Sequence, residues 1–303
     1  MKNTQSEKII DGKAVGAEIT EEIRKEVLEF SMTRKPPGLT VVIVGEDPAS
    51  QSYVGMKVRK AEKIGIRSDL IEMPADISEG YFLDRIKKLN DDEDVDGILV
   101  QMPLPSHIDQ QKVIEAIAPS KDVDGFHPYS LGRLAADKPT FVSCTPLGIT
   151  VLLKKYGVDT KGKKVTIVGR SLIVGKPMAL LLSGQSDTGN ATVTICHSRT
   201  VDLKDATIDA DILIAAAGQP YMITGDMVKE GVVAIDVGTT RVEDPTRKKG
   251  YRLAGDIDFD SVYPRASLIT PVPGGVGPMT VTMLMKNTLL AAKWARGMPD
   301  ESA

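Results

Sequence analysis

The chain runs KKVTIVGRSLIVG from Lys163 to Gly175, and this stretch decides the fold of its C-terminal half. Residues 163–168 form an apolar, β-branched run that predicts a buried strand. Gly169 permits a sharp turn after the strand, and Gly175 permits the next helix, predicted over Pro177–Leu182, to pack against it. The start of a helix offers free N–H groups and a partial positive charge to a pyrophosphate. The stretch therefore predicts a nucleotide-binding loop, and its alternative is a tight strand-to-helix turn.

The loop resembles the pattern G-x-G-x-x-G, with Ser171 at the second glycine and the last glycine one residue late. An NAD site usually places Asp or Glu at the end of the next strand. Here that strand, Ala191–Cys196, continues into His197-Ser198-Arg199 without an acid. Ser198 and Arg199, joined by Arg170 from the loop, can bind a 2′-phosphate instead, because a guanidinium donates two parallel hydrogen bonds. The pattern favours NADP over NAD; the alternative is that Arg199 is a solvated cation at a strand end.

The rest of this half continues the pattern of strands and helices. Two more apolar runs, Ile212–Ala216 and Val232–Val237, predict buried strands that end in small residues, where a flat ligand can approach the backbone. A doubly wound parallel sheet of Rossmann type follows from this spacing. Residues 279–294 predict a long closing helix.

Strands and helices also alternate in the first half, which predicts a second α/β domain with parallel strands. The predicted strands are 39–44 and 97–101. Helices are predicted at 12–30, from Asp47-Pro48 to about Lys63, and at 78–89, 109–117 and 145–155.

Composition excludes several classes of protein. The 303 residues carry a net charge of -3 and only 4% aromatic side chains, so a nucleic-acid partner is not expected. No apolar run reaches the roughly 18–20 residues that span a bilayer, so no membrane partner is expected. Two cysteines cannot build a disulfide framework or a four-cysteine zinc site, and no metal is predicted. A cytoplasmic enzyme fits these features.

Candidate chemical groups gather in the first half. Tyr53 and Lys57 lie four residues apart on one predicted helix, so they share a face, and a lysine beside a cleft can act as acid or base. Gln101 ends a buried strand, where its amide can bond a ligand or be satisfied internally. Asp124 lies in the turn KDVDG at 121–125 and can either stabilise the turn or bind a ligand edge that offers paired N–H groups.

The segment TPVPGGVGPMT at 270–280 contains three prolines and three glycines. Such density predicts a rigid loop with special backbone angles, and one proline bond is a candidate for the cis form. We expect a wall that faces a ligand; a hinge between domains is the alternative.

Together these segments resemble the bifunctional methylenetetrahydrofolate dehydrogenase/methenyltetrahydrofolate cyclohydrolase family over nearly the whole chain. The matching motifs are VGEDPAS at 44–50, YVGMK at 53–57, QMPLP at 101–105, KDVDG at 121–125, CTPLG at 144–148, GRSLIVG at 169–175 and PGGVGPMT at 273–280.

The resemblance implies two reactions on one folate. NADP accepts a hydride from 5,10-methylenetetrahydrofolate, and water then converts the 5,10-methenyl product into 10-formyltetrahydrofolate, which serves one-carbon metabolism and purine biosynthesis. It implies a catalytic folate domain over residues 1–146, completed by the helix at 280–303, and an NADP-binding domain over 147–279. It also implies a homodimer that forms through the nucleotide domains.

The resemblance further assigns roles to residues. Lys57 becomes the acid/base of the hydrolytic step, oriented by Tyr53 and hydrogen-bonded by Gln101. Asp124 holds the amino-pyrimidine edge of the folate. The remaining implied contacts are Pro271, Gly274 and Gly275 for the folate, and Gly169, Arg170, Ser171, Ser198 and Thr239, beside Arg199, for the cofactor.

Two other classes compete with this interpretation. Short-chain dehydrogenases also use Tyr-x-x-x-Lys, but there the motif follows the nucleotide loop within one domain, whereas Tyr53 and Lys57 precede Gly169 by more than a hundred residues. A nucleotide-sensing regulatory module would explain the second half and leave the polar residues of the first half without a role.

Overall fold

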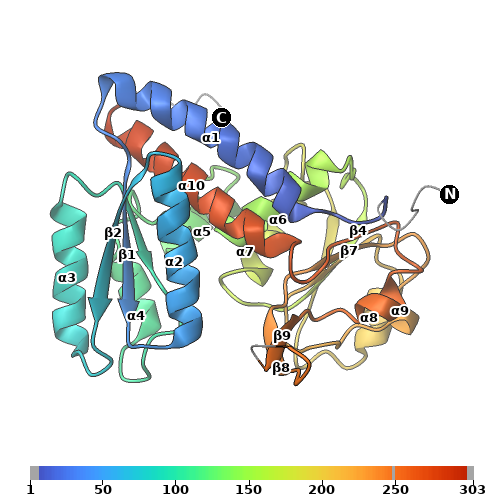
Figure 1. Cartoon of the computed structure of the whole chain (residues 1–303). Helices are drawn as coiled ribbons and strands as arrows, with labels where there is room; N and C mark the ends of the chain where they lie inside the picture. The colour runs from blue at the N-terminus through green and yellow to red at the C-terminus, as the bar shows by residue number, and fades with distance from the viewer. Residues whose placement is uncertain (1–6, 248–249, 299–303) are drawn as a thin grey trace. The chain divides into compact units, whose positions relative to one another are not determined.

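The computed structural model describes residues 7–247 and 250–298, and it divides the chain into two compact units (Figure 1). One unit, called here the lysine unit, holds residues 17–144 and the described chain from residue 281. The other, the nucleotide unit, holds residues 145–280 and the described chain before residue 17. The expected domain segments 1–6 and 299–303 lie outside the described residues. Both units are α/β, as predicted.

The lysine unit is built on a three-stranded parallel sheet in the order β2-β1-β3. Its strands are β1 (Gly38–Val44), β2 (Arg67–Met73) and β3 (Gly97–Val100). β1 is buried at every position, because it lies in the centre and both of its faces are covered. β2 was not predicted: it lies at the edge of the sheet and carries polar, exposed residues, so its sequence lacks the apolar run of a central strand.

The helices of this unit include α2 (Pro48–Lys63), α3 (Glu79–Asp91), α4 (Gln110–Ala116) and α5 (Pro128–Ala135). The first three lie where the sequence indicates, whereas α5 was not predicted. The Asp47 carboxylate accepts a hydrogen bond from the Ser50 N–H at 2.8 Å and caps α2, and Gly65 follows the helix with a φ of +88°. One sheet face, through Val42 and Ile98, packs against apolar residues of α3 and α4.

Two long helices lie side by side in Figure 1, α1 (Gly12–Thr33) and α10 (Val276–Ala295). The hydroxyls of Thr20 and Thr282 are 3.4 Å apart, and Lys293 forms a 2.7 Å ion pair with Glu26. Past the end of α10, Arg296 pairs with the buried carboxylate of Asp96 at 2.6 Å. The last part of the chain is thereby tied into the lysine unit.

The nucleotide unit contains a five-stranded parallel sheet in the order β10-β7-β6-β4-β5. Its strands are β4 (Lys164–Val168), β5 (Thr192–Cys196), β6 (Ile212–Ala215), β7 (Val233–Asp236) and β10 (Leu268–Ile269). The helices are α6 (Cys144–Lys155), α7 (Gly175–Ser183), α8 (Leu203–Ile208), α9 (Phe259–Val262) and the short η1 (Gly225–Met227). β5 and β6 flank β4, so the direction of winding changes there, as the doubly wound prediction requires.

Several features differ from the expectation, and β10, α8, α9 and η1 were not predicted. β5 is an edge strand with exposed residues, Ile195 among them, and not a buried strand. An antiparallel hairpin of β8 (Thr240–Glu243) and β9 (Tyr251–Ala254) was not predicted. Residues 8–10, expected with the first domain, extend the nucleotide sheet instead: the Ile269 N–H donates to Lys8 O and the Ile10 N–H donates to Ile269 O, both at 2.8 Å.

Candidate functional site

Helix α2 carries the two candidate residues of the Tyr-x-x-x-Lys motif. Val54 and Ala61 are buried and lie on the side of this helix that faces the core. Tyr53 is exposed, and Lys57, one turn later, is partly buried. The helix therefore anchors itself in the core and leaves an aromatic ring and an ammonium group at the boundary of the unit, as the spacing predicts.

Gln101 holds the side chain of Lys57. The Lys57 ammonium donates a hydrogen bond to Oε1 of Gln101 at 3.0 Å. The Gln101 amide donates in turn to the carbonyl oxygen of Met102 at 2.7 Å, which fixes the oxygen of the amide toward the lysine. Gln101 directly follows β3, so the rigid sheet sets the position of this pair.

Asp124 joins this site through electrostatics. Burial raises the pKa of the Asp124 carboxyl to about 6, the nearby Lys57 charge opposes this rise, and Asp122 adds to it. Asp122 itself is 2% exposed and is used structurally, because its carboxylate accepts the N–H of His127 at 2.8 Å. Lys57, Gln101 and Asp124 are thus brought together, although they come from three separate segments of the chain.

Two buried residues that the sequence analysis did not select support the Asp124 turn. The Asn287 amide on α10 donates to the carbonyl oxygens of Val123 at 2.8 Å and Val142 at 3.1 Å. The Cys144 thiol donates to the same Val123 oxygen at 3.3 Å, and burial, followed by the charge of Asp124, raises the pKa of this thiol. Asn287 could have been noticed as a polar residue within an apolar helix.

The loop after β4 shows why its glycines are needed. Gly169 has a φ of +132°, and a Cβ there would overlap the carbonyl oxygen of Ala216 at the end of β6. A Cβ on Gly175 would overlap the carbonyl oxygen of Gly169. The loop therefore turns tightly over the ends of β4 and β6, where ligands bind in doubly wound sheets.

The start of α7 differs from the expectation of free N–H groups. The Ser171 hydroxyl accepts hydrogen bonds from Val174 N at 3.1 Å and from Gly175 N at 3.5 Å. The Lys176 N–H donates to the Ser171 carbonyl oxygen at 3.0 Å. Ser171, at the place of the second glycine of the pattern, thus uses the donors that a phosphate would otherwise meet.

The turn after β5 presents the residues predicted for the 2′-phosphate. The His197 ring accepts the Arg199 N–H at 3.1 Å, and the Thr200 N–H donates to the His197 carbonyl at 2.8 Å. Ser198 and Arg199 are exposed on this turn, and Arg170 is exposed on the loop after β4. Within the described part of the chain, neither arginine forms an ion pair. Thr239 is exposed after β7.

The glycine- and proline-rich segment belongs to the nucleotide unit. The Val272–Pro273 peptide bond is cis, which agrees with the expectation that one proline bond of this segment could take the cis form. Gly275 is buried, and a Cβ on Gly12 would overlap its carbonyl oxygen, while the Lys13 N–H donates to Gly274 O at 3.0 Å. Pro271 and Gly274 are partly buried. The segment is therefore held by the start of α1.

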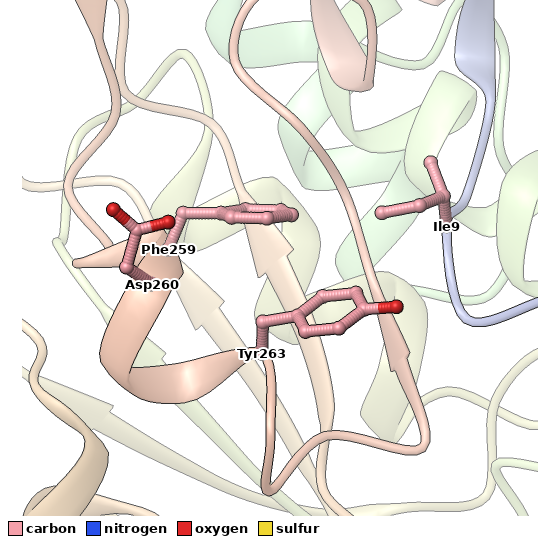
Figure 2. Close-up of a pocket in the computed structure, with 4 residues that line it drawn as sticks. All are labelled: Ile9, Phe259, Asp260 and Tyr263. Carbon is pink, nitrogen blue, oxygen red and sulfur yellow. The ribbon is translucent and has the colours of Figure 1, made fainter. Parts of the chain in front are cut away.

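A pocket of about 490 Å³ lies elsewhere in the nucleotide unit, and Figure 2 shows four of the residues that line it. Ile9, Phe259, Asp260 and Tyr263 line it, and the Phe259 and Tyr263 rings stack with centroids 5.4 Å apart. It contains none of the predicted site residues and no pair of groups suited to acid–base chemistry, so we assign the candidate site to the two regions above.

Among residues 7–247 and 250–298, no helix is long and apolar enough to cross a membrane. The same residues contain no group of three or more His, Cys, Asp or Glu side chains that could hold a metal ion.

Comparisons with known proteins match both halves of the chain. Residues 10–124 match the tetrahydrofolate dehydrogenase/cyclohydrolase catalytic domain, and residues 143–296 match the NAD(P)-binding domain of the same family. The chain is 53% identical over 288 residues to the bifunctional protein FolD of Bacteroides fragilis, covering 95% of this chain and 98% of that protein. It is 56% identical over 294 residues to the bifunctional protein FolD of Chlorobium limicola, covering 96% and 99%.

Solved structures give the same result. The FolD methylenetetrahydrofolate dehydrogenase/cyclohydrolase of Campylobacter jejuni is 45% identical with a TM-score of 0.89, covering 94% of this chain and 98% of that one. The Trypanosoma brucei enzyme, solved with NADP and an inhibitor, is 41% identical with a TM-score of 0.91, covering 95% and 98%. Matches of this identity and coverage settle the family: the chain is a member of the tetrahydrofolate dehydrogenase/cyclohydrolase family.

Proposed function

We propose that Lys57 is the acid/base residue of a bifunctional enzyme that oxidises 5,10-methylenetetrahydrofolate with NADP and hydrolyses the 5,10-methenyl product to 10-formyltetrahydrofolate. The observation that carries this proposal is the 3.0 Å hydrogen bond from Lys57 to Gln101, beside the carboxyl of Asp124. It combines a proton-transfer group, a residue that orients it and an acceptor for the substrate.

Hydrolysis takes a proton from the attacking water and gives a proton to the ring nitrogen that leaves, and one lysine side chain can serve both transfers. Water attacks the methenyl carbon, and Lys57 accepts one of its protons. Lys57 then returns a proton to the ring nitrogen as the carbon–nitrogen bond breaks, and the remaining hydroxyl proton is released to solvent as the formyl C=O forms on the other nitrogen. Gln101 keeps the Nζ of Lys57 in place through both steps, because its own amide is fixed on the Met102 carbonyl.

The same geometry supports the substrate contacts that we propose. The Asp124 carboxylate accepts two N–H groups from the amino-pyrimidine edge of the folate, since a carboxylate binds a planar pair of donors well. Tyr53 is exposed one turn before Lys57, so its ring is free to pack on the flat pterin. The family resemblance also assigns Pro271, Gly274 and Gly275 to folate binding. We propose the catalytic domain over residues 1–146 with 280–303, except for residues 8–10, which pair with the nucleotide sheet.

The cofactor site fits NADP. A Cβ on Gly169 would overlap the carbonyl oxygen of Ala216, so glycine is needed for the loop to turn tightly at the carboxyl ends of β4 and β6, where nucleotides bind in doubly wound sheets. Arg170, Ser198 and Arg199 are exposed and offer the positive charge that a 2′-phosphate requires, and Thr239 follows the neighbouring strand β7. NADP, when bound, accepts the hydride. Gly169 and Ser171 shape the loop that orients it, within a domain of residues 147–279.

We also propose a cytoplasmic homodimer that supplies one-carbon units for purine biosynthesis. The exposed edge strand β5, with Ile195 on its surface, supports dimer formation through the nucleotide unit, because an edge strand offers unpaired backbone groups to a second copy. Cys144 and Cys196 are both free and buried, which fits a reducing compartment.

Absorbance-monitored turnover tests the function. Purified protein is mixed with methylenetetrahydrofolate and either NADP or NAD, and we expect reduced cofactor to form with NADP. Methenyltetrahydrofolate supplied alone should lose its absorbance faster than in buffer. No reduced cofactor with either nucleotide would contradict the oxidative function, and unchanged methenyl decay would contradict the hydrolytic one.

A further inference from the structure

Two buried carboxylates lie at the carboxyl end of the nucleotide sheet, and the proposed reaction does not use them. Asp236 ends β7 and is 4% exposed. Asp256 lies two residues after β9 and is completely buried. Buried acids are uncommon unless they are paired with a cation, and neither forms a salt bridge within the part of the chain that the structure describes.

The Asp236 carboxylate binds the backbone around Asp256. Its Oδ1 accepts the N–H groups of Gly238 and Asp256, both at 2.9 Å, and its Oδ2 accepts the N–H of Ile257 at 2.9 Å. Both oxygens are therefore engaged with backbone donors. This arrangement fixes the main chain of Asp256 against the end of β7.

Asp256 reaches across to the loop that follows β6. Its Oδ2 accepts the N–H groups of Ala217 at 2.6 Å and Gly218 at 2.9 Å. Its Oδ1 is buried without a hydrogen-bond partner, and a Cβ on Gly238 would overlap that atom. One oxygen thus holds two successive backbone amides, while the other faces tightly packed backbone.

The loop at 216–218 is a wall of the proposed cofactor site. β6 is the direct neighbour of β4, and the two strands flank the point where the sheet reverses its winding. The carbonyl oxygen of Ala216 lies directly beside Gly169, the first residue of the nucleotide loop. Gly218 has a φ of +69°, which glycine adopts without strain, and this lets the exposed loop turn while its N–H donates to Asp256.

Electrostatics show that the Asp236 carboxylate is held at a cost. Burial raises the pKa of Asp236 to about 6, and the neighbouring charge of Asp256 adds to the rise. Acids kept buried and close together against this tendency are typical of functional sites.

We propose that Asp256 is a positioning residue for the cofactor: through the amides of Ala217 and Gly218 it holds the loop after β6 in the shape that receives NADP, and Asp236 holds Asp256. This inference rests on the proposed binding of NADP in the nucleotide unit. A loop that is already shaped before the ligand arrives loses less conformational freedom when the ligand binds.

The test compares Asp256→Ala with Asp256→Asn. Alanine removes the acceptor of both amides, whereas asparagine keeps one acceptor oxygen and can place its NH₂ group where Oδ1 has no partner. We expect the Kd for NADP, measured by calorimetry, to rise at least about tenfold in Asp256→Ala and to stay within about threefold in Asp256→Asn. Hydrolysis of methenyltetrahydrofolate without nucleotide should stay within about twofold in both variants, because this step does not use NADP.

A second measurement uses the unaltered protein and does not depend on the folding of a variant. Hydrogen exchange at the amides of Ala217 and Gly218 should be slow without nucleotide and change little when NADP is added. Fast exchange that slows only with NADP would overturn the inference. Unchanged NADP binding in a folded Asp256→Ala protein, or equal losses of NADP binding and hydrolysis, would overturn it as well. Wild-type protein that binds no NADP would instead contradict the proposed function, and this inference with it.

Discussion

Lys57 donates a 3.0 Å hydrogen bond to Gln101, and the Gln101 amide is itself fixed by its 2.7 Å bond to the carbonyl of the next residue. The first residue comes from the middle of a helix and the second from the end of a strand, 44 positions later. Both elements are rigid, so the Nζ of Lys57 is held before any substrate arrives. Preorganisation of this kind favours proton transfer at one defined place.

Lys57→Met should abolish most of the hydrolytic activity while the protein stays folded. Methionine keeps most of the length of the side chain and removes the amine, so we expect methenyltetrahydrofolate hydrolysis to fall by at least about 100-fold, the usual range for loss of an acid/base group. Absorbance of the methenyl compound measures the rate, and circular dichroism confirms the fold.

The matched control is Lys63→Met, the same substitution at an exposed position of the same helix. This control should hydrolyse the methenyl compound at the wild-type rate. A folded Lys57→Met protein with wild-type hydrolysis would remove Lys57 from the mechanism, whatever the effect on the oxidative step.

Acid pH should weaken folate binding through Asp124. Burial raises the pKa of this carboxyl to about 6, so it takes up a proton as the pH falls through that value. A protonated carboxyl accepts the paired N–H groups of the folate less well than a carboxylate does. The KM for the folate should therefore rise below about pH 6 and be constant above it.

Asp124→Asn should raise the folate KM by about 10- to 100-fold at pH 7.5, because a hydrogen bond to a charged group contributes about 1.5–3 kcal/mol. It should also remove the rise in KM at acid pH, since asparagine does not titrate. The Kd for NADP serves as the control and should not change. A variant that keeps the acid dependence of the wild type would show that another group titrates.

Replacing Arg170 and Arg199 by alanine should weaken NADP much more than NAD. Both side chains are exposed on loops at the ends of neighbouring strands, and NAD lacks the 2′-phosphate that they would bind. We expect the Kd for NADP to rise by about 10- to 100-fold in the double variant, and that for NAD by less than about threefold. Equal effects on the two nucleotides would refute the phosphate assignment.

The sequence predicted those elements whose pattern depends only on neighbouring residues. Central strands such as β1 are buried on both faces and appear as apolar runs, and α2 carries its own cap at Asp47. The edge strand β2 and the hairpin of β8 and β9 were not found, because exposed strands lack an apolar run and depend on pairing with distant segments.

The site shows the same division. Lys57, Gln101 and Asp124 lie in motifs that could be recognised one by one, whereas Asn287 supports the Asp124 turn from 164 residues away. Ser171 shows what a motif does not reveal. The pattern predicted its position in the loop, but it did not predict that its hydroxyl accepts hydrogen bonds from the amides at the start of α7. Long-range contacts of these kinds leave little trace in one sequence.

Lys60 should reduce the stability of the protein near neutral pH. Its ammonium is partly buried and donates to the Thr282 hydroxyl at 2.6 Å, and burial lowers its pKa from 10.5 to about 8. The folded state therefore binds this proton less tightly than the unfolded state does. In the wild type, the resulting destabilisation is fully present below pH 8 and is relieved as the pH rises from about 8 to 10.5.

Lys60→Met removes the charge and keeps the apolar stem, so its free energy of unfolding should exceed that of the wild type by about 1 kcal/mol at pH 7, after allowance for solvent screening of a partly exposed group. The advantage should shrink toward pH 10, because the wild-type amine is then largely neutral when folded. Urea unfolding at pH 7 and pH 10 measures both values, and Lys63→Met, which changes an exposed lysine, should show neither effect. A Lys60→Met protein that is less stable than the wild type at pH 7 would mean that the bond to Thr282 outweighs the cost of burying the charge.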